Sequence, residues 1–109
     1  MQIKYDADIQ LDAVVQNLKR LTNQVYKLLP NREEGTDWKK PLTTILEEFS
    51  GMDSLLLDHH IILFPLLCKL EGLFSLDGEE ADEKRNFFIF RKTIFECLGL
   101  IGELIKKCQ

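Results

Sequence analysis

The segment between Pro30 and Pro41 carries the first residues with a chemistry of their own, one indole among three cations. These candidate ligand-binding residues are Arg32, Trp38, Lys39 and Lys40. An indole can stack on a base while cations hold its phosphate, so the set predicts a site for a small anionic, nucleotide-like ligand. The same mixture is typical of anchors in protein–protein interfaces. In the alternative without any ligand, Trp38 folds back over the helix ends and the charges stay in solvent.

Arg91 is a further candidate for ligand binding. Phe87 and Phe95 lie four residues before and after it, so one helix face reads aromatic, guanidinium, aromatic. A guanidinium stacks on rings and grips a carboxylate or a phosphate in two places. Burying an arginine alone is costly, so we expect Arg91 either to pair with an internal acid, Glu47 or Glu48, or to bind an anionic ligand. The internal pair is the expectation that requires no ligand.

The histidines and cysteines have spacings that favour structural roles. His59 and His60 are adjacent, so on a helix they cannot both ligate one metal from one face. We expect them at a helix boundary, with one ring buried and one in solvent. Cys68, Cys97 and Cys108 match no disulfide framework or zinc motif, which predicts three free thiols, with Cys68 and Cys97 as inert packing. The sequence therefore predicts no metal site, no cofactor and no catalytic residue.

Acidic residues are the remaining source of catalysis, because small all-α bundles include the MazG-type nucleotide pyrophosphohydrolases, which collect magnesium with helical Glu and Asp. Such enzymes need paired acids on facing helices, whereas Glu47 and Glu48 are neighbours and Asp53 is turned off their face. A second acidic run precedes the last predicted helix and comprises Glu79, Glu80, Asp82 and Glu83. Acids at a helix amino terminus complement the helix dipole, so this run predicts a capped, solvated end.

The elements that carry these residues are four predicted helices, which indicate an all-α fold, a compact four-helix bundle in a single domain, 1–109. The first helix starts from a cap at Asp6 or Asp8 and runs to Leu29, where Pro30 stops it. Its apolar residues repeat at heptad spacing: Leu11, Leu18 and Val25 on one line, Val14, Leu21 and Leu28 on the other. This pattern predicts antiparallel packing inside a bundle.

The second predicted helix spans about Asp37–Leu57, with Asp37 as its cap and a kink or early end at Ser50 and Gly51. Asp58 is the expected cap of the third helix, in which Pro65 must bend the helix or mark its beginning. The apolar residues of this third helix are Ile61, Ile62, Phe64, Leu66, Leu67 and Leu70. Their density predicts the most buried helix of the fold, kinked or broken from the second.

The last predicted helix, Asp82–Lys107, follows a turn at Gly72–Ala81 and is apolar on two faces. One face is predicted to pack in the core. It consists of two heptad lines, Phe87, Ile94 and Ile101 on one and Phe90, Cys97 and Leu104 on the other. The second face carries the candidate interface residues, Phe88, Phe95, Gly99 and Gly102. A helix with two apolar faces needs two partners, so the second face predicts self-association with another copy, or a ligand.

Net charge and hydropathy bear on whether the protein binds nucleic acid or a membrane, and on where it is located. A formal net charge of −4 argues against binding to duplex nucleic acid, which requires clustered Lys and Arg. The amino-terminal residues lack an apolar signal region, and no apolar run is long enough to span a bilayer. We therefore expect that the protein does not associate with a membrane and that it is cytoplasmic, in a bacterial or virus-infected cell.

Three functions remain. The leading one is a small non-enzymatic binding or adaptor protein that acts as a homo-oligomer, with itself and another protein as partners. The alternative is a protein of viral or mobile-element type that sequesters a small anionic ligand with Arg91 and the cations and indole of the loop. The third is a metal-dependent nucleotide phosphohydrolase of MazG-like architecture.

Overall fold

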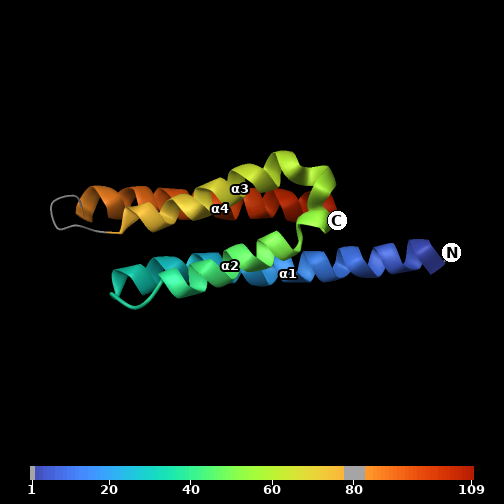
Figure 1. The fold of residues 1–109 in the computed structure, drawn as a ribbon, viewed down its shortest axis with the longest axis horizontal. Helices are drawn as coiled ribbons and strands as arrows, with labels where there is room; N and C mark the ends of the chain where they lie inside the picture. The colour runs from blue at the N-terminus through green and yellow to red at the C-terminus, as the bar shows by residue number, and fades with distance from the viewer. Residues whose placement is uncertain (1, 78–82) are drawn as a thin grey trace.

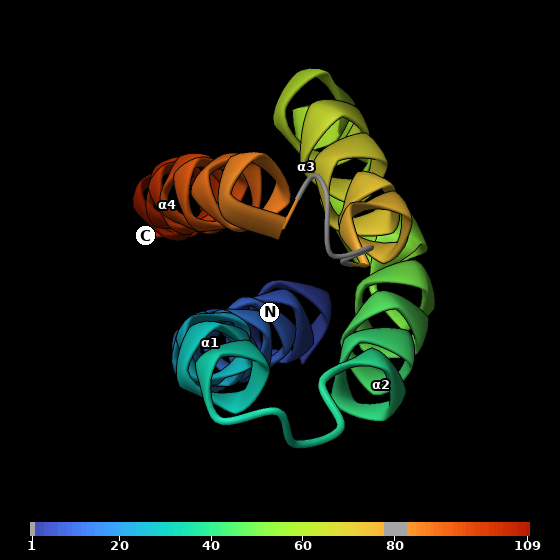
Figure 2. The same cartoon turned by 90° about the vertical axis from the view of Figure 1, so that its left-hand side faces the viewer.

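The computed structural model describes residues 2–77 and 83–109 of the chain. This part of the chain contains four α-helices and two short 3-10 helices. They are α1 (Gln2–Glu33), α2 (Lys39–Gly51), η1 (Asp53–His59), α3 (His60–Gly72), η2 (Leu73–Leu76) and α4 (Glu83–Cys108). Successive α-helices run in opposite directions (Figure 1) and occupy the four corners of a bundle in chain order, with α4 beside α1 (Figure 2). The predicted all-α four-helix bundle is confirmed.

The core follows the two heptad patterns. On α1, Leu18, Leu21, Val25 and Leu28 are fully buried. On α4, the fully buried side chains are Phe90, Ile94, Cys97, Ile101 and Leu104. These two stripes face one another, and the contact between α1 and α4 is the most extensive between any two elements that the structure describes. The periodicity of the sequence therefore identified the faces that form the core, except at Leu11, which is 41% exposed, and at Phe87, which is half-buried.

The first helix is longer than predicted at both ends. It begins at Gln2, so the predicted start at Asp6 or Asp8 is wrong, and Pro30 also lies inside the helix. Pro30 removes only one backbone hydrogen bond, which a helix tolerates near its end. The helix ends instead at Glu33, two residues before Gly35, whose φ of 74° is accessible to glycine.

The end of α1 has the hydrogen bonds of a Schellman motif. Thr36 donates its backbone N–H to the carbonyl of Asn31 at 2.9 Å, and Gly35 donates to that of Arg32 at 3.2 Å. The helix therefore continues for one turn beyond Pro30, and that extra turn carries Arg32.

Two predictions for the second helix are confirmed. The side chain of Asp37 accepts the backbone N–H groups of Lys39 and Lys40 at 3.0 and 3.2 Å, so it caps the first turn of α2. The helix ends at Gly51, and the η1 helix that follows contains a non-helical residue, Leu56, with φ −109° and ψ 18°. The segment predicted as one helix is therefore two pieces.

Two predictions for the third helix are wrong. Asp58 makes no capping hydrogen bond to α3, which begins at His60 and contains Pro65. The helix is also not the most buried, because Ile61 is 90% exposed and Phe64 is 58% exposed. Only one side of α3 faces the bundle, with Ile62, Leu63, Leu66 and Leu70, so its remaining apolar residues meet solvent.

The connection to α4 differs from a simple turn, because Leu73–Leu76 forms η2. Residues 78–82 lie outside the described part of the chain, and with them lie the predicted helix start at Asp82 and the acids Glu79 and Glu80. By length and composition alone, Asp53–Leu76 is apolar enough to cross a membrane. Core helices of soluble proteins are often as long and as apolar, but they are mostly buried. Only 22% of the most apolar 18-residue stretch of Asp53–Leu76 is buried.

Candidate binding site

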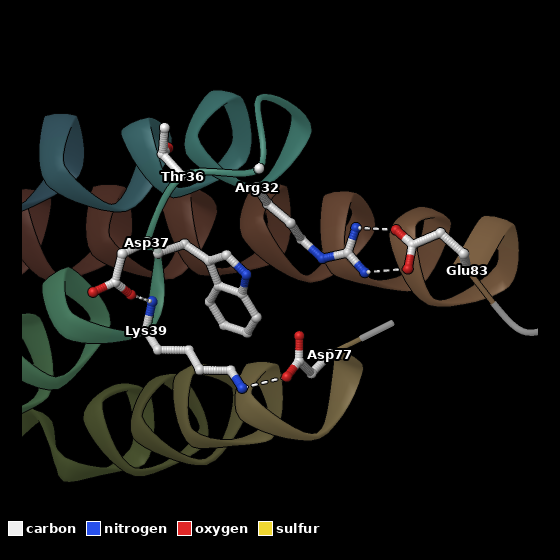
Figure 3. A pocket seen from close by; sticks show the side chains of 8 residues that line it. Arg32, Thr36, Asp37, Lys39, Asp77 and Glu83 are labelled. Atoms are coloured by element: carbon white, nitrogen blue, oxygen red, sulfur yellow. Dashed lines mark hydrogen bonds and ion pairs between the residues drawn. The ribbon is translucent and has the colours of Figure 1, made fainter. Parts of the chain in front are cut away.

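A pocket of about 340 Å³ opens at the end of the bundle where α1 leads into α2 (Figure 3). Its lining consists of Arg32, Gly35, Thr36, Asp37, Trp38, Lys39, Asp77 and Glu83. Three of the five predicted ligand residues, Arg32, Trp38 and Lys39, thus lie together. The other two, Lys40 and Arg91, do not line this pocket.

Arg32 is the most constrained charged group of this pocket. Its side chain is only 5% exposed and reaches from the end of α1 to the start of α4. Its Nη1 donates to Oε1 of Glu83 at 2.9 Å and its Nη2 donates to the carbonyl of Leu76 at 2.8 Å. The guanidinium carbon lies 5.4 Å from the ring centre of Phe87 and 5.1 Å from that of Phe90. Arg32 therefore ties α1, η2 and α4 together.

Arg32 has a signal in the sequence that the prediction missed. It lies seven residues after Val25 and fourteen after Leu18, on the buried heptad line of α1. A first helix that ends at Pro30 excludes Arg32 from this line, so the sequence prediction does not identify its buried position. For Glu83 the sequence predicts only a complement to the helix dipole, and for Asp77 it predicts no role.

Trp38 is buried, so its indole is not accessible for stacking on a base, as the predicted nucleotide-like site requires. The side chain is 6% exposed. Its ring stacks near Phe74 with 6.4 Å between centres and meets Phe90 edge to face at 5.0 Å. The alternative is confirmed for Trp38, because the indole folds back and fills the space between the start of α2, η2 and α4. It is wrong for Arg32, whose charged side chain is buried rather than in solvent.

The charges of the pocket are largely internal. Lys39 forms an ion pair with Asp77, and Arg32 is paired with Glu83 (Figure 3). Asp37 is the third carboxylate of the lining, so the described lining has two cations against three acids. An anionic ligand would have to displace a carboxylate that is already bound. Lys40 is exposed on α2 and bonds to Asp37 only through its backbone.

Arg91 does not form the internal pair that we expected. It is exposed on α4, with its guanidinium carbon 5.9 Å from the ring centre of Phe95. Glu48 accepts a hydrogen bond from Arg20 at 2.6 Å instead, and Glu47 is exposed. The buried guanidinium that lies against aromatic rings is therefore that of Arg32, and not that of Arg91.

The second apolar face of α4 is exposed, as its sequence predicted. Phe88 is 67% exposed and Phe95 49%, and Gly99 is also exposed while Gly102 is half-buried. The first two, with Arg91, Lys92 and Glu96, line a shallow hollow of about 520 Å³. We call Phe88, Arg91, Phe95, Gly99 and Gly102 the α4 outer face.

The three thiols have different surroundings. Cys97 is fully buried, and this burial raises the pKa of its thiol to about 12. Burial also raises the pKa of Cys108, which is half-buried. Cys68 is exposed on α3, so its predicted role as core packing is wrong. All three are free thiols, as predicted.

Two histidines and one ion pair lie on or beside α3. His59 is half-buried at the end of η1, and His60 is exposed at the start of α3, which confirms the predicted boundary. Lys69 donates to Glu96 at 2.9 Å, and this hydrogen bond lowers the pKa of Glu96 and raises that of Lys69. No group of three His, Cys, Asp or Glu within the described residues could hold a metal ion.

No known protein family matches the chain, and no curated protein or solved structure is significantly similar to it. The pocket at the loop and the exposed apolar faces are therefore the features from which a function can be inferred.

Proposed function

We propose that this protein is a small, non-enzymatic binding or adaptor protein that acts as a homo-oligomer in the cytoplasm. The observation that supports this most directly is the pair Phe88 and Phe95, two large aromatic side chains at heptad spacing that are exposed on α4. Contiguous exposed apolar surface on a soluble protein marks an interaction site more often than a lone exposed residue does. The α4 outer face is therefore the proposed interface.

The α4 outer face combines large and small residues in an order that suits pairing with itself. In an antiparallel pair with Phe95 at the two-fold axis, Phe88 faces Gly102 of the partner subunit, and Arg91 faces Gly99 of the partner subunit. A ring would then enter the space left by a glycine, and no atom beyond the neighbouring backbone lies within 4 Å of a Cβ built at either glycine. Such an isologous contact closes as a dimer.

The other two functions gain less support from the geometry. Sequestering a nucleotide-like ligand needs free cations and an accessible indole, whereas Arg32 and Lys39 are paired and Trp38 is buried. A MazG-like phosphohydrolase needs converging carboxylates, whereas Glu47 is exposed and Glu48 holds Arg20. Self-association requires neither feature.

Sedimentation at tens of micromolar protein tests the proposal. The parent should sediment as a dimer or larger oligomer, with a total buried interface of roughly 1,000 Å² or more. The double variant Phe88→Glu and Phe95→Glu should be a folded monomer, because both side chains are largely exposed within one copy.

Tyr26→Glu is the matched control, because Tyr26 is an exposed aromatic residue on α1, outside the α4 outer face. This variant should keep the oligomeric state of the parent. A monomeric parent, or an oligomer unaffected by the double variant, would contradict the proposed interface.

A further inference from the structure

The outer side of α3 and the adjoining η1 carry a second exposed apolar surface. It consists of Leu57, Ile61, Phe64 and Cys68, which follow one another at spacings of four, three and four residues. We call these four residues the α3 stripe. They lie on the side of the helix away from the buried Ile62 and Leu66, so no element within the described residues covers them.

The spacing of the α3 stripe matches that of a helix that packs along another helix. Alternating intervals of three and four residues place side chains in one seam, which is the pattern used for helix-to-helix packing. Within α3, the seam from Ile61 to Cys68 is roughly 10 Å long at the rise of a helix. Leu57 extends it from η1, beyond the non-helical His59. The α3 part of the seam fits about two turns of a single partner helix.

The charges around the α3 stripe are acidic. Asp53 lies four residues before Leu57, Asp58 directly follows Leu57, and Glu71 lies three residues after Cys68. All three acids are exposed. The only lysine or arginine in Asp53–Leu76 is Lys69, and it is already paired with Glu96. Within Asp53–Leu76, the stripe thus has carboxylates at both ends and no lysine or arginine other than Lys69.

The α4 side of the stripe adds further negative charge. A hollow of about 310 Å³ begins at Pro65, the neighbour of Phe64, and extends to Gly99 and Leu100 on α4. The charged residues of its lining are Lys69, Glu96 and Glu103. Because Lys69 is paired with Glu96, the lining has one carboxylate in excess, and a helix on the α3 stripe would have this excess negative charge along one edge.

We propose that the α3 stripe binds an amphipathic helix of a partner protein whose apolar seam is flanked by lysine and arginine. This rests on the proposed binding function and adds the chemistry of the partner. Basic flanks complement Asp53, Asp58 and Glu71, and such complementarity favours both encounter and register. A second copy would bring acids against acids, and an anionic bilayer would repel them. A membrane-spanning Asp53–Leu76 would bury Asp58, Lys69 and Glu71 at a high cost.

The experiment uses two labelled 18-residue peptides with the same leucine seam, one with lysine and one with glutamate at the other positions. Fluorescence anisotropy with the full chain should show at least tenfold tighter binding of the lysine peptide, weakened by added salt. The double variant Ile61→Ser and Phe64→Ser should lose this binding, while Tyr26→Ser on α1 should retain it. Asp58→Lys combined with Glu71→Lys should shift the preference toward the glutamate peptide.

The oligomeric state separates this proposal from the preceding one. Peptide binding should persist in the Phe88→Glu and Phe95→Glu monomer, and the Ile61→Ser and Phe64→Ser variant should keep the parent's oligomeric state. Equal binding of both peptides would overturn the proposal. So would conversion of an oligomer to a monomer by the α3 substitutions, which would identify a second copy as the occupant. Binding to vesicles of phosphatidylcholine with phosphatidylserine, without binding to the lysine peptide, would assign the stripe to a membrane.

Discussion

A single side chain, Arg32, joins three elements at one end of the bundle. Its guanidinium is nearly inaccessible, yet its partner Glu83 is 49% exposed. Removal of the arginine therefore leaves a carboxylate that water can reach, which limits the penalty relative to a fully buried pair. The contacts with Phe87 and Phe90 add packing by the aliphatic stem and the planar group.

We expect Arg32→Met to lower the free energy of unfolding by roughly 1–3 kcal/mol, because it removes charge-assisted hydrogen bonds while retaining much of the side-chain volume. Arg85→Met is the matched control, because Arg85 is exposed on α4 and does not belong to the α4 outer face. It should change stability by less than about 0.5 kcal/mol. Urea denaturation measures both, and a larger loss in the Arg85 variant would contradict the role assigned to Arg32.

Cysteine substitutions should separate the buried thiol from the exposed one. Cys97→Ala should destabilise the protein by roughly 1 kcal/mol through a small cavity, whereas Cys68→Ala should have almost no effect on stability. A maleimide reagent should label Cys68 first and Cys97 only on unfolding. Rapid labelling of Cys97 in the native protein would show that the core is more open than the structure indicates.

Cys97 also predicts a loss of stability at alkaline pH. Burial raises its pKa to about 12, whereas an unfolded thiol titrates near roughly 8.5. Between these values the unfolded chain binds fewer protons than the folded one, so the free energy of unfolding falls as pH rises. Below the pKa of the unfolded thiol, Cys97 is protonated in both the folded and the unfolded state, so its titration does not change the free energy of unfolding. Thermal melts from pH 8 to 11 should show a shallower decline for Cys97→Ala than for the parent.

At the scale of the elements, the backbone at the helix ends decides where each helix stops. Gly35 ends α1 with a positive φ, whereas Gly72 ends α3 with a helical φ of −60° and ψ of −23°. Beyond the neighbouring backbone, a Cβ at either position would meet no atom within 4 Å, so steric contact does not distinguish the two glycines, whereas their backbone conformations do. This difference predicts opposite effects for the same substitution.

Gly35→Ala should destabilise the protein by roughly 1 kcal/mol, because an alanine is strained at positive φ. Gly72→Ala should instead stabilise it by about 0.5–1 kcal/mol, because alanine loses less backbone entropy in a helical conformation. Calorimetric melting of the two variants provides the comparison. The same sign of effect in both would show that the Schellman motif does not determine the end of α1.

The whole molecule is a bundle with one continuous core and two exposed apolar faces, on α4 and α3. Trp38, the only tryptophan of the chain, contacts Phe74 and Phe90, so its surroundings depend on the joining of several elements. Its fluorescence is therefore a probe of the assembled bundle.

We expect native Trp38 emission to be that of a buried indole and to shift to the red on unfolding, in the same transition as the loss of helical circular dichroism. Nucleotides should neither quench this emission nor raise the melting temperature, because the ring is covered and the cations of the pocket are paired. Quenching by a nucleotide, with a rise in melting temperature, would support the sequestering function instead.

Local periodicity and turn chemistry were enough to predict the features that one helix shows by itself. The buried lines of α1 and α4, the break at Gly51 and the exposed apolar face around Phe88 and Phe95 all follow from the positions of apolar and helix-breaking residues along the chain. These features depend on contacts within a few turns, where helical geometry relates sequence spacing directly to a face.

Only the tertiary structure decided which sides of each helix are covered and which charges meet. Ile61 is as apolar as Ile62, yet one faces solvent and the other the core, because the bundle gives α3 neighbours on one side alone. Arg32 meets Glu83 across 51 positions of sequence, a pairing that requires α1 to continue past Pro30 and α4 to return beside it. Such contacts depend on helix ends and bundle geometry, which residue spacing within a helix does not determine.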